Sequence, residues 1–208
     1  MILIMMLIDW VETIDQHQGV RMSRVTPAPL DQYRPLFGGD APLRQRIYAQ
    51  APEIAGPYLE FMTAMRKRTV LPNRLVELVR LRVSFHNQCR SCMAMRYSDG
   101  YEDGLTEGLV CSLERPQEAS DLTPAERSAI AFADLMATDH LAISDATFGD
   151  LREHFDEREI MDLCFQVAAF VGFGRMGSAL AMTDDLPEEY SDPDAVLAPW
   201  RQTPQSVV

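Results

Sequence analysis

Two cysteines three residues apart, Cys89 and Cys92, are the residues of this sequence best suited to redox chemistry. In a helix, which turns by about 100° per residue, the two side chains lie about 60° apart, and Arg96 lies between them one turn further along. A helix N-terminus and an adjacent cation both favour the thiolate, which is the nucleophilic form of cysteine. With this spacing one sulfur can attack an oxidant and the other can close a disulfide, so the pair could support a reversible two-electron cycle.

Two other interpretations of the same cysteines remain open. Cys89 and Cys92 could be inert thiols in a helical core. Alternatively, His86, Cys89, Cys92 and Cys111 could bind zinc, but Glu114 occupies the position where a second CxxC motif would have its cysteine.

The composition is that of a globular protein that folds without disulfide staples. Of the 208 residues, 47% are hydrophobic and 24% are charged. The net charge of -12 argues against binding to nucleic acid or to an anionic membrane. The four cysteines are too few and too unevenly spaced for a secreted disulfide scaffold, so we expect a reducing, cytoplasmic compartment.

The first residues have the features of neither a signal peptide nor a membrane span. The run MILIMMLI is too short to cross a bilayer, no basic residue precedes it, and Asp9 follows it. We therefore expect no export signal and no membrane anchor. The sequence from Met22 onward is typical of an ordinary N-terminus, and residues 1–21 could be a peripheral extension.

Helical periodicity dominates the rest of the chain. Residues 23–42 are rich in Pro and Gly and are predicted to form an irregular arm. One or two short helices are expected over residues 53–65, with a break at Pro57, and a mostly buried helix is expected after Pro72. A further helix, with Asn87 as its N-cap, is predicted to carry both cysteines and to run toward Gly100.

Sequence signals for helix starts recur in the second half of the chain. Thr123 and Asp156 are each followed three residues later by Glu, which predicts two capping boxes, and Ser144 begins a shorter helix between them. The small residues of 172–177 predict tight helix packing. We find no alternating run typical of a strand, so we predict an all-α fold. We divide the chain into three parts. Residues 1–42 are an N-terminal extension and irregular arm, and residues 43–185 are a helical domain. Residues 186–208 are an extended tail that could wrap a neighbouring subunit.

The segment from Glu77 to Arg96 resembles the signature of the carboxymuconolactone decarboxylase and alkylhydroperoxidase D superfamily, in particular its thiol peroxidase-like branch. That signature is a Glu on one helix, then a Ser and an Asn, then CxxC, and a His four residues on. The resemblance continues through LTPAERSAIAFADLMA and FGDLREHFDEREIMDL and covers residues 45–185. Arg96 stands where the His belongs, and the matching residues are Glu77, Ser84, Asn87, Cys89 and Cys92.

The resemblance implies a fold built around a helical hairpin and a homo-oligomer with the cysteines near a subunit interface. It also implies that Cys92 is the peroxidatic thiol, that Cys89 is the resolving thiol and that Glu77 belongs to a proton relay. Arg96 cannot act as a general base because its pKa exceeds about 12, although its charge can stabilise a thiolate. His86 could take part of the relay.

We therefore expect a thiol-dependent, peroxidase-like oxidoreductase. Its expected partners are a hydroperoxide or another small-molecule substrate, a thiol or dithiol reductant protein, and further copies of the same chain. No cofactor and no metal are predicted. The alternatives are a decarboxylase-type enzyme of the same superfamily and a non-enzymatic thiol redox sensor or binding protein on the same fold.

Overall fold

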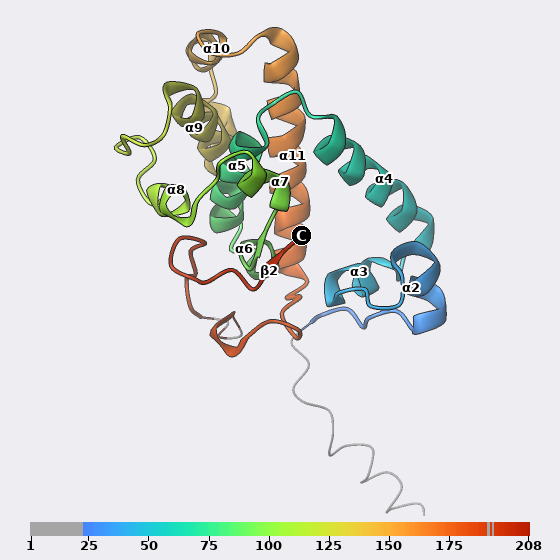
Figure 1. Cartoon of the computed structure of the whole chain (residues 1–208). Helices are drawn as coiled ribbons and strands as arrows, with labels where there is room; N and C mark the ends of the chain where they lie inside the picture. The colour runs from blue at the N-terminus through green and yellow to red at the C-terminus, as the bar shows by residue number, and fades with distance from the viewer. Residues whose placement is uncertain (1–22, 191, 193) are drawn as a thin grey trace, which may run out of the picture.

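Helices dominate the part of the chain that the structure, a computed structural model, describes: residues 23–190, 192 and 194–208 (Figure 1). Within those residues the extended segments are β1 (Met95–Arg96) and β2 (Ser206–Val207), which pair in parallel. The predicted all-α fold is confirmed. Our expectations for residues 1–21 lie outside the described residues.

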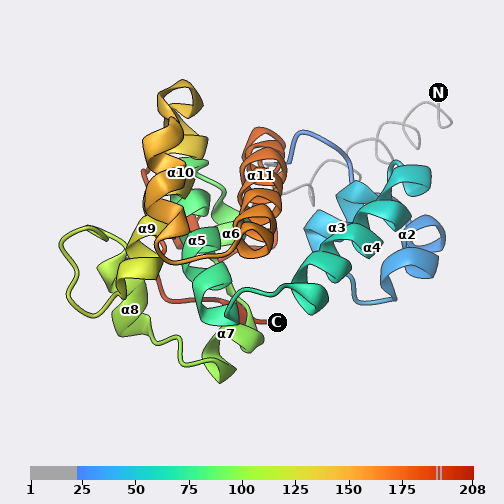
Figure 2. The same cartoon turned by 90° about the horizontal axis from the view of Figure 1, so that it is seen from above.

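Three helices form the centre of the fold: α5 (Asn73–His86), α9 (Pro124–Thr138) and α11 (Glu157–Ala179). Figures 1 and 2 show α5 between α9 and α11. Nine of the 14 residues of α5 are buried, because its Leu and Val side chains meet neighbours on nearly every face. The prediction of a mostly buried helix after Pro72 is thus confirmed, with Pro72 as its N-cap.

The predicted capping boxes fix the starts of α9 and α11. Thr123 Oγ1 accepts a hydrogen bond from the Glu126 N–H at 3.2 Å, and the Glu126 carboxylate accepts one from the Thr123 N–H at 2.8 Å. Asp156 and Glu159 form the same reciprocal pair at 2.8 and 2.9 Å. Each such cap contributes about 0.5–2 kcal/mol to the stability of its helix. The shorter helix α10 (Asp145–Arg152) follows Ser144, as predicted.

The N-terminal part of the described chain is more helical than predicted. Residues 23–42, predicted to be irregular, contain α2 (Leu30–Phe37), and α3 (Leu43–Tyr48) and a continuous α4 (Pro52–Arg68) follow. Residues 23–68 are called the N-terminal arm below. Pro35 lies inside α2 and Pro57 inside α4, so the predictions of an irregular segment and of a helix broken at Pro57 were wrong. Both prolines occupy the sixth helical position, where the missing N–H removes a single intrahelical hydrogen bond near the helix start. The arm lies on the side of α11 opposite α9 (Figure 2).

The helix predicted from Asn87 to Gly100 is divided into three pieces. These are α6 (Arg90–Met93), β1 and α7 (Ser98–Glu102), and α8 (Glu107–Ser112) comes after them. The helix ends early because the carbonyls of Ala94 and Arg96 accept hydrogen bonds from the amides of Gln205 and Val208 at 2.7 and 2.9 Å. Those carbonyls are therefore not available to continue the helix. Asn87 itself is the C-cap of α5 rather than the N-cap of the next helix.

The C-terminal segment packs on its own chain. Its described residues include β2 and the 3-10 turn η2 (Glu188–Tyr190), and another 3-10 turn, η1 (His140–Ala142), follows α9. Gln88 Nε2 donates to the Leu197 carbonyl at 3.1 Å, and Arg90 Nη2 donates to the Ala195 carbonyl at 3.0 Å. The segment that we expected to reach a neighbouring subunit therefore covers the cysteine-bearing α6.

Among the described helices, α11 is long and apolar enough to cross a membrane by length and composition, with a mean hydropathy of 1.2 over its best window. The long core helix of a globular protein meets the same criterion. In this fold Ile160, Leu163 and Val167 of α11 are buried in the main hydrophobic cluster.

Candidate active site

The two CxxC cysteines are joined in a disulfide, with their Cα atoms 5.2 Å apart. Cys89 is the N-cap of α6 and is fully buried. Cys92 lies within α6, is half-buried, and lines a cavity of about 320 Å³. The buried position of Cys89 leaves Cys92 as the sulfur that a molecule in this cavity can reach. Because α6 has four residues, it supplies less dipole stabilisation than the longer helix predicted from the sequence.

Two glycines of α11 leave space for the chain around Cys89. A Cβ atom on Gly177 would lie 3.2 Å from Cys89 Sγ, and one on Gly174 would lie 2.4 Å from Asn87 Nδ2. A Cβ on Gly172 would meet nothing within 4 Å. The tight packing predicted for residues 172–177 is therefore found at Gly174 and Gly177, and the α5–α6 turn fills the space.

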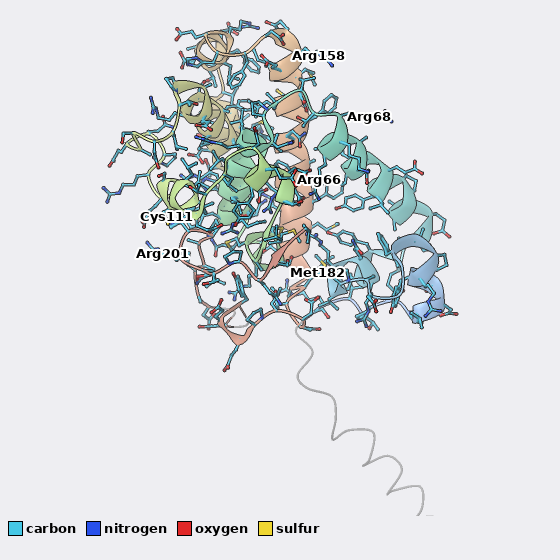
Figure 3. All side chains as sticks on the ribbon, in the orientation of Figure 1. Arg66, Arg68, Cys111, Arg158, Met182 and Arg201 are labelled. Atoms are coloured by element: carbon cyan, nitrogen blue, oxygen red, sulfur yellow. A yellow bond between two sulfur atoms is a disulfide. The ribbon has the colours of Figure 1, made fainter. Side chains whose placement is uncertain are left out.

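The cavity lies between the N-terminal arm and the central helices. Its walls come from α3, α4, α5, α11 and the segment from Cys92 to Gly100, and Phe37, Pro42 and Val208 also line it. Figure 3 shows Arg66 reaching from α4 toward the central helices, and its Nε atom lies 2.8 Å from Asp99 Oδ2 in α7. The apolar part of the wall includes Tyr48, Tyr58, Leu59, Met62, Val76, Phe170 and Phe173.

Glu77 and Arg80 form a buried ion pair beside the cysteines. Arg80 Nε and Nη2 donate to the two carboxylate oxygens of Glu77 at 2.6 and 2.7 Å, and the Tyr97 N–H donates to the same carboxylate at 3.0 Å. Both side chains are almost completely buried. Burial alone would lower the pKa of Arg80, but the Glu77 carboxylate holds that pKa above its ordinary value, so the guanidinium stays charged.

Arg80 connects this ion pair to the CxxC segment. Its Nη1 atom donates to the Cys92 carbonyl and its Nη2 atom to the Met95 carbonyl, each at 2.8 Å. Its guanidinium lies over the Tyr97 ring, 4.5 Å from the centroid, and lines the cavity. Arg80 was not among the residues predicted from the sequence. The available signal was a charged residue three positions after Glu77 in the same helix, which places both side chains on one face.

Arg96 lies in the interior, away from the cavity wall. It is fully buried, pairs with Glu107 at 3.1 Å, and donates to the carbonyls of Met93 and Pro199, each at 2.9 Å. Its guanidinium therefore holds the CxxC segment to α8 and to the C-terminal segment. Asp99, three residues after Arg96, pairs with Arg66 instead.

His86 lies on the α9 side of α5, and it is not among the residues that line the cavity. Its Nε2 atom is 2.6 Å from Asp134 Oδ1, and Arg82 Nε donates to the same oxygen at 2.7 Å. Burial alone would raise the pKa of Asp134, but the contacts with His86 and Arg82 outweigh it and lower that pKa below its usual value.

The zinc alternative finds no geometric support in the described part of the chain. Cys89 and Cys92 are bonded to each other, and His86 faces Asp134. The exposed Cys111 lies near Trp200, with its sulfur 3.8 Å from the Trp200 carbonyl oxygen. No group of three or more His, Cys, Asp or Glu side chains among the described residues is arranged to hold a metal ion.

Comparisons with known proteins find similarity over the region that contains the CxxC segment. The model of the carboxymuconolactone decarboxylase family matches residues 52–135, which include Glu77, Cys89 and Cys92. The uncharacterised protein YdfG of Bacillus subtilis is 29% identical over 132 residues, which cover 62% of this chain and 90% of that protein.

Two solved structures show the same fold. An uncharacterised peroxidase-related protein of Ralstonia eutropha, with an alkylhydroperoxidase AhpD core, superposes with a TM-score of 0.64 at 21% identity, covering 83% of this chain and 96% of that one. The debrominase Bmp8, solved in complex with 2,3,4-tribromopyrrole, has a TM-score of 0.64 at 18% identity, covering 81% of this chain and 94% of that one. With its CxxC segment inside the matched region, this chain is similar to the carboxymuconolactone decarboxylase family over residues 52–135 and has the all-helical alkylhydroperoxidase D fold.

Proposed function

We propose that the protein is a thiol-dependent peroxidase that reduces hydroperoxides while Cys89 and Cys92 cycle between dithiol and disulfide. The observation that carries this proposal is the arrangement of the pair: the sulfurs are close enough to bond, and Cys92 lines the cavity while Cys89 is buried. A peroxidatic thiol must meet its substrate, whereas a resolving thiol must meet only its partner. The arrangement therefore favours Cys92 as the attacking residue.

The reaction has two steps. The Cys92 thiolate attacks the hydroperoxide, an S–O bond forms as the O–O bond breaks, and the alcohol leaves after it takes up a proton. The Cys89 sulfur then attacks the sulfenic acid on Cys92, an S–S bond forms as the S–O bond breaks, and the oxygen leaves as water. Two thiols are oxidised to a disulfide, and the hydroperoxide is reduced to an alcohol and water.

The buried ion pair has a positioning role in this proposal. Arg80 fixes the backbone at Cys92 and Met95, and Glu77 balances its charge. Glu77 holds Arg80 through two hydrogen bonds and is the residue for which the family resemblance implies a relay role. We assign the structural role of holding the CxxC segment to Arg96, and we assign no relay role to His86, which faces Asp134.

The cycle requires a reductant, and a dithiol protein of a reducing, cytoplasmic compartment fits the chemistry. A donor thiolate attacks the accessible Cys92 sulfur, and Cys89 leaves as a thiolate. A second donor thiol then resolves the mixed disulfide, which leaves both cysteines reduced and the donor oxidised. No metal or organic cofactor takes part in these steps.

Other activities on this fold make different demands on the cysteines. A decarboxylase-type reaction on a lactone needs no redox-active pair, so it would continue after either cysteine is replaced. A thiol sensor would form the disulfide but would not turn over with a dithiol donor. A dehalogenase would consume a halogenated aromatic compound, such as the ligand bound to Bmp8, rather than a hydroperoxide.

Replacing each cysteine by serine tests the proposal. Cys92→Ser should abolish hydroperoxide consumption, because a serine hydroxyl is a poor nucleophile toward peroxide. Cys89→Ser should react once and then accumulate sulfenic acid or over-oxidised Cys92, detectable by mass spectrometry. Cys111→Ser, which changes an exposed thiol outside the cavity, is the matched control and should keep wild-type turnover. Equal activity of Cys92→Ser and wild type would overturn the proposal.

A further inference from the structure

One of the arginines that line the Cys92 cavity stands apart from the others. Three arginines contribute to the wall, Arg44, Arg66 and Arg80. Arg66 pairs with Asp99 and also donates to the Val208 carbonyl oxygen at 2.8 Å, and Arg80 pairs with Glu77. Arg44 is therefore the lining arginine whose charge is not matched by an ion pair among the described residues.

Arg44 has no carboxylate partner among the described residues. It lies in α3 and is half-buried, and its Nη2 atom is 3.7 Å from the Met95 sulfur, which is a weak acceptor. A partly desolvated guanidinium is normally paired with a carboxylate or phosphate, because loss of hydration must be offset by strong hydrogen bonds. The donors of Arg44 are thus free to bind an anionic group inside the cavity.

An aromatic wall lies beside this guanidinium. Tyr58 is in edge-on contact with Tyr48 and with Phe173, at centroid distances of 5.2 and 4.7 Å. Burial raises the pKa values of the Tyr48 and Tyr58 phenols, and the charge of nearby Arg44 acts in the opposite direction. Both phenols therefore stay neutral at physiological pH, so the wall is aromatic and uncharged and can cover an apolar body.

We propose that the preferred substrate is an organic hydroperoxide that carries a carboxylate, and that Arg44 is the residue that selects it. The carboxylate pairs with Arg44, the apolar body lies along Tyr48, Tyr58 and Phe173, and the peroxide group is at Cys92. The cavity volume of about 320 Å³ is at the lower end of the range for small-molecule sites, which suits a compact aromatic acid. This inference rests on the proposed peroxidase function for its chemistry, but its binding part can be tested separately.

A matched pair of substrates tests the selectivity. Cumene hydroperoxide and its para-carboxylate differ by one anionic group, so their ratio of kcat/KM isolates the effect of that charge. We expect wild type to prefer the carboxylate by about tenfold or more, mainly through KM, because a charge-assisted bidentate contact is made in the bound substrate. Arg44→Gln should remove the preference, so that the ratio of the two kcat/KM values approaches one. Arg44→Lys keeps the charge but lacks the planar guanidinium that makes two parallel hydrogen bonds, so it should retain part of the preference for the carboxylate.

The exposed Arg68 of α4 provides the control, since it carries the same charge but is not among the cavity-lining residues (Figure 3). Arg68→Gln should keep the full preference. If Arg68→Gln and Arg44→Gln reduce the preference equally, the effect is one of net charge and the assignment of Arg44 is wrong. If wild type shows no preference for the carboxylate, the substrate class is wrong while the peroxidase function stands.

A binding measurement separates failure of this inference from failure of the proposed function. The probes are the two corresponding alcohols, cumyl alcohol and its para-carboxylate, which cannot oxidise a thiol. Calorimetry measures the affinity of each alcohol for the disulfide form of the protein. Tighter binding of the carboxylate by wild type but not by Arg44→Gln supports the anion site even if no hydroperoxide is consumed. Equal affinity of wild type and Arg44→Gln for the carboxylate would overturn the inference.

Discussion

Gly174 of α11 is in direct contact with the side chain of Asn87, the last residue before the turn into the CxxC segment. A Cβ atom at position 174 would lie 2.4 Å from Asn87 Nδ2, and that nitrogen donates to the Phe170 carbonyl at 3.0 Å. Asn87 is buried, so its side chain has little space into which it can move. The position of the CxxC turn therefore depends on the absence of a side chain on α11.

We expect Gly174→Ala to destabilise the protein by about 1–3 kcal/mol, the usual cost of forcing extra volume into a packed site. Gly172→Ala is the control on the same helix, because a Cβ there meets nothing within 4 Å. Its expected effect is a stabilisation of up to about 1 kcal/mol from the higher helix propensity of alanine. Chemical denaturation measures the free energy of unfolding of both variants. Equal effects of the two substitutions would contradict the packing role of Gly174.

Arg96 occupies the position at which the family signature has a His, and its buried contacts predict the effect of restoring that residue. Arg96→His should lower the free energy of unfolding by about 2–4 kcal/mol, because an imidazole cannot reach Glu107 and two carbonyls at once. Denaturant unfolding of wild type and Arg96→His under the same conditions measures the difference. An unchanged stability together with higher peroxide turnover would show that position 96 takes part in the chemistry rather than in holding the fold.

The carboxylate of Asp134 should make the stability of the protein sensitive to acid. Its pKa is lowered in the folded state by His86 and Arg82, so its contribution is complete above the unfolded pKa of about 3.9. That contribution is lost as the pH falls through the lowered folded pKa. The difference in unfolding free energy between wild type and Asp134→Asn should therefore shrink as the pH falls from about 5 to 2. Asp150→Asn, at an exposed carboxylate of α10, is the control for the loss of one negative charge.

The homo-oligomer expected from the sequence stays a prediction, and the surface of α11 supplies a way to test it. Met161, Phe165 and Met176 are 50%, 53% and 37% exposed, and their spacing places them along one face of the helix. We expect Phe165→Asp to lower the mass measured by light scattering at micromolar concentration. Leu141→Asp, at an isolated exposed leucine in η1, should leave it unchanged. A monomeric mass for wild type would rule the prediction out.

Local spacing was enough to predict the helices that carry their own start signals. Thr123 with Glu126, and Asp156 with Glu159, are reciprocal pairs whose geometry depends on four consecutive residues. The CxxC spacing likewise predicted that Cys89 and Cys92 could bond.

Features that depend on distant segments were missed. The early end of α6 depends on amides of the C-terminal segment, and the burial of Arg96 depends partly on the Pro199 carbonyl, 103 positions away. The roles of Arg80 and Arg44 also depend on segments that are distant in the sequence. The role of Arg80 depends on where the chain folds back at Cys92, and the cavity that includes Arg44 forms where α3 approaches the central helices. Periodicity within one element contains no information about such contacts.

A single-turnover experiment follows the proposed dithiol–disulfide reaction through one round. The fully reduced protein is mixed with a limiting amount of cumene hydroperoxide, without any external donor, and thiol loss, alcohol formation and the Cys89–Cys92 peptide are followed together. We expect each equivalent of hydroperoxide to yield one equivalent of alcohol and one Cys89–Cys92 disulfide, with two thiols lost and with Cys111 and Cys164 still reduced. A rate no higher than that of free thiol, or oxidation at Cys111 or Cys164 in place of the pair, would contradict this expectation.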